Sequence, residues 1–184
     1  MMRTIFAAFS LLGITFVAAQ TIPRPAIAGY TVAREGAKPF TIGDYKGKVI
    51  AFAFILTTCS HCQETCGLLT KLNSELGPRG FQPLAAAIND NPEVPRFVHD
   101  FRINFPVGAV SRETVYPFLE HSMMDPRLNM PQMVFIDRAG MVRAQYPGED
   151  SFFENQEKNI RDMVLKLLAE PAAKKNSEPT KKRS

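Results

Sequence analysis

The sequence predicts an α/β fold class: a central mixed β-sheet with helices on both faces and an N-terminal β extension. Two observations lead to this prediction. Short runs rich in Val, Ile and Phe alternate along the chain with segments whose apolar residues recur at helical spacing. The run from Val49 to Leu56 is apolar at all eight positions, as expected for a strand buried on both faces. The 184 residues suit about one domain, and 45% hydrophobic residues can build its core.

The first nineteen residues have the layout of a secretory signal peptide. Arg3 supplies a positive charge, an apolar stretch runs from Ile5 to Val17, and small residues precede an expected cut after Ala19. We therefore expect residues 1–19 to be removed and the mature protein to be exported, to the periplasm or the extracellular space. The alternative is an uncleaved membrane anchor, although the stretch is shorter than the ~20 residues of a spanning helix.

Residues 20–170 are expected to form one domain. After an extended lead-in, two short strands flank a polar turn that contains Gly36 and Pro39. The buried strand 49–56 comes next, followed by a helix over 59–76 with four leucines on one stripe and a Gly-Pro stop. The remaining segments show the same two periodicities. The expected strands are 30–32, 40–42, 49–56, 81–88, 105–110, 133–136 and 141–145, and the expected helices are 59–76, 94–101, 111–121 and 152–168.

The net charge of +4 is concentrated at the end of the chain. Residues 174–184 hold five of the 22 basic side chains and one acid, so the body of the protein is close to neutral. A basic surface for nucleic acid is therefore not expected on the domain. The tail, 171–184, is too polar to pack and is expected to be disordered; its alternative role is contact with an anionic membrane surface or an acidic partner.

The motif Cys59-Ser60-His61-Cys62 lies where the buried strand ends and a helix begins. Backbone N–H groups at a helix start stabilise an anion, and the thiolate is the nucleophilic form of cysteine. Cys62 is one turn further along the helix and is placed to attack a mixed disulfide formed by Cys59. With a strand before it and a helix after it, this spacing indicates redox chemistry.

The run from Phe40 to Cys62, with Gly47-Lys48-Val49 before the strand, resembles the thioredoxin superfamily. More narrowly, it is similar to exported thiol–disulfide oxidoreductases of the TlpA/ResA type and to the related redoxin and AhpC/TSA domains. The segment from Met130 to Gly140 is similar to the second signature of that group, in which a cis-proline opens a strand. The resemblance implies a thioredoxin-like fold, with Pro131 as the cis-proline packed against the cysteine pair.

Several positions depart from the pattern of the group. Thr58 stands where members usually carry Trp, and Ala53 stands where thioredoxins keep a buried acid. Thr65 occupies the place of a Glu in the ResA-type reductases. His61, inside the pair, resembles the strongly oxidising DsbA group at that position alone. An imidazole near Cys59 favours the thiolate and so makes the disulfide more oxidising; the alternative is a His that faces solvent.

Cys66, four residues after Cys62, has three interpretations. It is a small buried apolar residue, a possible third thiol that pairs with another cysteine, or a soft metal ligand. The copper interpretation resembles the exported Sco-type proteins, whose two cysteines have the spacing of Cys62 and Cys66. Distant ligands would then be His99 or His121, the latter beside Met123 and Met124.

A thiol peroxidase of the peroxiredoxin kind is the other enzymatic alternative. Peroxiredoxins place Pro and Thr seven and three residues before the reactive Cys, where this chain has Phe52 and Leu56. The sequence therefore favours an exported thiol–disulfide oxidoreductase that acts through Cys59 and Cys62. We expect a monomer without cofactor or metal, whose partners are protein thiols and disulfides together with an unidentified redox partner.

Overall fold

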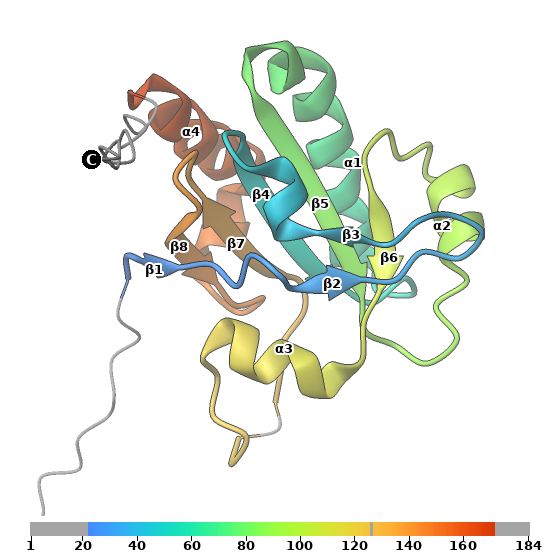
Figure 1. Cartoon of the computed structure of the whole chain (residues 1–184). Helices are drawn as coiled ribbons and strands as arrows, with labels where there is room; N and C mark the ends of the chain where they lie inside the picture. The colour runs from blue at the N-terminus through green and yellow to red at the C-terminus, as the bar shows by residue number, and fades with distance from the viewer. Residues whose placement is uncertain (1–21, 126, 172–184) are drawn as a thin grey trace, which may run out of the picture.

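The computed structural model describes residues 22–125 and 127–171, so the expected signal peptide (1–19) and almost all of the basic tail (171–184) lie outside it. Six strands form a mixed sheet in the order β1-β8-β7-β4-β5-β6, and β2 pairs with β3 in a separate hairpin (Figure 1). The strands are β1 Arg24–Pro25, β2 Thr31–Val32, β3 Phe40–Thr41, β4 Val49–Ile55, β5 Phe81–Ala87, β6 Val107–Ala109, β7 Gln132–Ile136 and β8 Met141–Tyr146. The α-helices are α1 Ser60–Leu76, α2 Val94–Asp100, α3 Arg112–Leu119 and α4 Gln156–Ala169.

Strand β4 is the centre of the sheet and is buried at all seven positions. It runs parallel to β5 and antiparallel to β7. Its side chains alternate between two cores, because successive residues of a strand point to opposite faces. Ala51 and Ala53 belong to the core that α1 and α4 cover, whereas Phe52 and Phe54 belong to the core under α3 and the β2–β3 hairpin. The predicted mixed sheet with helices on both faces is confirmed.

The N-terminal β extension is confirmed as well. Val32 and Phe40 of the hairpin are buried in the second core, and an isolated bridge between Ala33 and Ala109 ties the hairpin to β6. Gly108 makes this close approach possible, because a Cβ there would lie 2.1 Å from the Ala33 carbonyl oxygen. The lead-in that precedes the hairpin forms β1, which pairs with β8 at the edge of the large sheet.

Two predicted elements differ from the structure. The last helix does not run unbroken from Phe152: residues Ser151–Asn155 form a 3-10 turn, capped by the Asp150 carboxylate at 2.7 Å from the Phe152 amide, and α4 begins at Gln156. The strand expected over 105–110 is reduced to β6, since Pro106 has no N–H to donate to a ladder. Among the described residues, no helix has the length and apolar character needed to cross a bilayer.

Candidate active site around the cysteine pair

Cys59 is the N-cap residue of α1, directly after the turn that ends β4. Its amide donates to the Leu56 carbonyl at 3.1 Å, and its own carbonyl accepts from the Gln63 amide at 3.0 Å, which starts the helix. The side chain is partly exposed, and Cys59, Cys62 and Cys66 are all free thiols in this structure. Cys59 therefore lies at the positive end of the helix dipole and is accessible from solvent, as the sequence predicts.

Cys62 lies behind Cys59 and has no exposed surface. Burial raises the pKa of its thiol strongly, and a hydrogen bond with Cys59 raises that pKa further, while a hydrogen bond with the Leu56 backbone acts in the opposite direction. Cys62 is thus held as a neutral thiol beside the partly exposed sulfur of Cys59. The pair combines one accessible and one protected sulfur.

Asn89, in the loop after β5, fixes the turn that carries Cys59. Its Oδ1 accepts from the Thr57 amide at 3.1 Å, and its Nδ2 donates to the Thr57 hydroxyl at 3.1 Å. Gln63 Nε2 donates to the Thr57 carbonyl at 2.9 Å. The polar groups of Thr57 are therefore bound from two sides, which holds the position of Cys59. No motif in the sequence points to Asn89, because its partner lies 32 residues earlier.

Pro131 follows a cis peptide bond and immediately precedes β7, in agreement with the resemblance. It lies near the end of β4, since Gln132 is paired with Phe54. Gly148 packs against this segment from the other side: its amide donates to the Asn129 carbonyl at 3.0 Å. A Cβ at Gly148 would come within 2.7 Å of the Met130 carbonyl group, so only glycine fits without displacing the proline loop.

His61 is exposed on the first turn of α1, where it lines a groove of about 890 Å³ together with Pro131 and residues of the α4 segment. Within the described part of the chain, its ring makes no hydrogen bond or ion pair. Cys66 lies one turn beyond Cys62, fully buried in the core beneath α1, and burial raises its pKa to about 12. The structure thus brings His61 and Pro131 to one groove and places Cys66 in the apolar interior.

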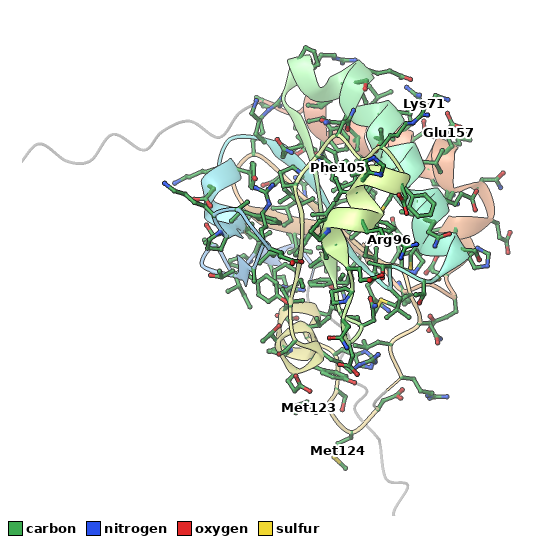
Figure 2. All side chains as sticks on the ribbon, turned by 90° about the vertical axis from the view of Figure 1, so that its right-hand side faces the viewer. Lys71, Arg96, Phe105, Met123, Met124 and Glu157 are labelled. Carbon is green, nitrogen blue, oxygen red and sulfur yellow. The ribbon has the colours of Figure 1, made fainter. Side chains whose placement is uncertain are left out.

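The candidate copper ligands far from the cysteines have other surroundings. His99 is exposed on α2 and lies 3.0 Å from the Asp100 carboxylate, whereas His121 Nε2 lies 2.9 Å from the Asp125 carbonyl. Met123 and Met124 project from the loop after α3 and are largely exposed (Figure 2). No group of three or more His, Cys, Asp or Glu side chains in residues 22–125 and 127–171 is arranged to hold a metal ion. The structure does not bring the sequence-predicted copper ligands together.

Comparison with known proteins places this site in a family. The model of the AhpC/TSA family matches residues 24–145, which include the cysteine pair and Pro131. The chain belongs to the AhpC/TSA family. No curated protein is significantly similar to it in sequence.

Solved structures share the fold of this AhpC/TSA domain. A thiol:disulfide interchange protein of the thioredoxin family from Chlorobium tepidum matches with a TM-score of 0.66 and 23% identity, over 82% of this chain and 99% of that one. A secreted disulfide oxidoreductase from Mycobacterium tuberculosis matches with a TM-score of 0.56 and 14% identity, over 73% and 96%. The thioredoxin domain of a thiol-disulfide oxidoreductase from Bacteroides vulgatus matches with a TM-score of 0.55 and 17% identity, over 73% of this chain and 96% of that one. At these identities the likeness establishes a thioredoxin-like fold.

Proposed function

We propose that the protein is an exported thiol–disulfide oxidoreductase that exchanges disulfides with protein thiols through Cys59 and Cys62. The observation that carries the proposal is the arrangement of the two cysteines: a partly exposed Cys59 at the start of α1 and, one turn further on, a fully buried Cys62. The names of the three structural neighbours, each an interchange protein or disulfide oxidoreductase, support the same activity.

The reaction follows from the difference in access. The Cys59 thiolate attacks one sulfur of a substrate disulfide, a mixed disulfide forms, and the other substrate sulfur leaves as a thiolate that takes up a proton. Cys62 then loses its proton and attacks the sulfur of Cys59, which releases the second substrate thiol and leaves a Cys59–Cys62 disulfide. Two electrons pass from the protein to the substrate, and the same steps in reverse oxidise a substrate dithiol. The choice of direction depends on a second dithiol or disulfide protein that resets the pair.

The remaining parts of the proposal concern the organisation of the chain. Residues 1–19 act as a signal peptide, 20–170 form the redox domain and 171–184 form a basic tail. The mature protein works as a monomer in the periplasm or outside the cell, without cofactor or metal. Export is consistent with thiol chemistry, because protein disulfides persist in those compartments.

Single turnovers with a disulfide-linked peptide test the proposal. The reduced protein is mixed with the peptide, and the products are identified by mass spectrometry. We expect Cys59→Ser to abolish exchange and Cys62→Ser to accumulate a mixed disulfide through Cys59, whereas Cys66→Ala, the matched control, still exchanges. Exchange by the Cys59→Ser variant, or a Cys62–Cys66 disulfide as the oxidised form, would overturn the assignment.

A further inference from the structure

The groove beside the cysteine pair has a marked excess of acidic side chains. His61 and Pro131 line its end near the cysteines, and the rest is lined by the turn before α4, the first turns of α4 and one face of α1. Five carboxylates line the groove, against two basic side chains. The carboxylates are those of Glu64, Glu149, Asp150, Glu154 and Glu157.

The two basic residues of the groove, Lys158 and Arg161, are already paired. Lys158 Nζ donates to Asp162 at 2.7 Å, and Arg161 donates to Glu75 at 2.6 Å and lies 3.7 Å from Glu157. Glu157 is also paired with Lys71 across the contact between α1 and α4, as Figure 2 shows. These charges are therefore largely compensated by their neighbours.

Three exposed carboxylates, those of Glu64, Glu149 and Glu154, make no ion pair with a described residue. Arg127 interacts electrostatically with Glu149, but its guanidinium is hydrogen-bonded to the Asp125 carboxylate at 2.9 and 3.1 Å. The uncompensated charge of the groove is therefore negative.

Gln156 also lines the groove, and the residue is 9% exposed. The Thr65 hydroxyl lies 2.9 Å from the His61 carbonyl oxygen and 2.8 Å from Oε1 of Gln156, so this side chain links the start of α4 to the first turn of α1.

We propose that this groove binds the segment of the substrate polypeptide next to its reacting cysteine and selects substrates that carry Lys or Arg there. The inference rests on the proposed function, because the groove serves the same cysteine pair. An ammonium or guanidinium group offers only donors and a positive charge. The groove offers the complement: three carboxylates without an ion pair to a described residue, in the groove that His61 and Pro131 also line.

Single-turnover kinetics with three matched peptides test the selectivity. The peptides share one disulfide and differ only in two residues beside the reacting cysteine, which are Lys, Gln or Glu. At low salt we expect the reduced protein to reduce the Lys peptide at least about fivefold faster than the Glu peptide. The ratio of the two rate constants should fall toward one in about 0.5 M NaCl, which screens exposed charges.

Variants then locate the effect. In the triple variant Glu64→Gln, Glu149→Gln, Glu154→Gln, the ratio of the rate constants for the Lys and Glu peptides is expected to be close to one. The control triple variant Glu35→Gln, Asp90→Asn, Glu113→Gln removes the same net charge from exposed positions that do not line the groove, so it should keep the ratio of the unmodified protein. Circular dichroism confirms that each variant is folded. An equal loss in both triple variants would overturn the groove as the selective element.

The same experiment separates the two proposals. Exchange at equal rates with all three peptides would overturn the selectivity and leave the oxidoreductase function in place. No exchange with any peptide by the folded, reduced protein would overturn both.

Discussion

In the middle of β4, the two faces carry side chains of very different size. On one face Phe52 and Phe54 form a cluster of rings with Tyr30 and Phe118, with centroids of neighbouring rings 4.6 to 6.1 Å apart. On the other face the middle of β4 contributes Ala51 and Ala53, between Val49 and Ile55, in the core that also contains Cys62 and Cys66 of α1. Large side chains stabilise the first face, whereas small ones on the second leave room for the helix that carries the thiols. Stability and chemistry are therefore separable in this protein, and the variants below test that separation.

The largest effect is expected on the aromatic face. Phe118→Ala removes a fully buried ring that contacts three others, and it should lower the free energy of unfolding by about 3–5 kcal/mol. Urea denaturation followed by circular dichroism measures the change, and Phe118→Leu serves as a milder variant that keeps a large apolar side chain. The folded fraction should exchange disulfides at the unmodified rate. A slower rate in folded Phe118→Leu would contradict the separation of the two faces.

The second effect is expected at the link between Asn89 and the cysteine turn. Asn89→Ala leaves the Thr57 amide and hydroxyl without their partner, so we expect a loss of about 1–3 kcal/mol in unfolding free energy and a slower attack by Cys59. Asn73→Ala is the matched control, because Asn73, near the C-terminal end of α1, also makes two hydrogen bonds to one residue, the exposed Asn104. Equal exchange rates in the two variants would mean that Asn89 supports the fold alone.

Local periodicity accounts for the elements that the sequence predicts well. The apolar run of β4 and the leucine stripe of α1 each carry their own signal, and together they place Cys59 at the start of a helix. The contacts that complete the site have no such signal. Thr57 with Asn89, and Gly148 with the Met130 carbonyl, join segments distant in sequence through single polar or steric contacts. The groove likewise combines residues of α1, the proline loop and α4, so its charge is visible only after folding.

A third test measures how the free energy of unfolding changes at alkaline pH. Burial raises the Cys66 pKa from 9.0 to about 12, so above pH 9 the unfolded chain releases a proton that the native state keeps. The free energy of unfolding therefore falls as the pH rises from 9 toward 12, by at most about 1.4 kcal/mol per pH unit for one thiol. We expect the free energy of unfolding of the Cys66→Ala variant to fall less steeply with pH than that of the unmodified protein, as measured by urea titrations across this range. Parallel curves would contradict a neutral, buried Cys66.

The smallest effect is expected for His61. The reduced pair reacts through the Cys59 thiolate, whose negative charge a nearby imidazole would stabilise, whereas the disulfide has no charge to stabilise. His61→Ala should therefore lower the reduction potential. Since the ring is exposed and has no hydrogen bond to a described residue, solvent limits the effect to no more than about 30 mV, equivalent to about 1.4 kcal/mol. Equilibration with glutathione measures the potential, and Ser60→Ala, at the preceding exposed position, is the control. A higher potential in His61→Ala, or the same decrease in both variants, would show that the imidazole does not tune the pair. The reduction potential of the cysteine pair would then be set by the helix N-terminus and the burial of Cys62.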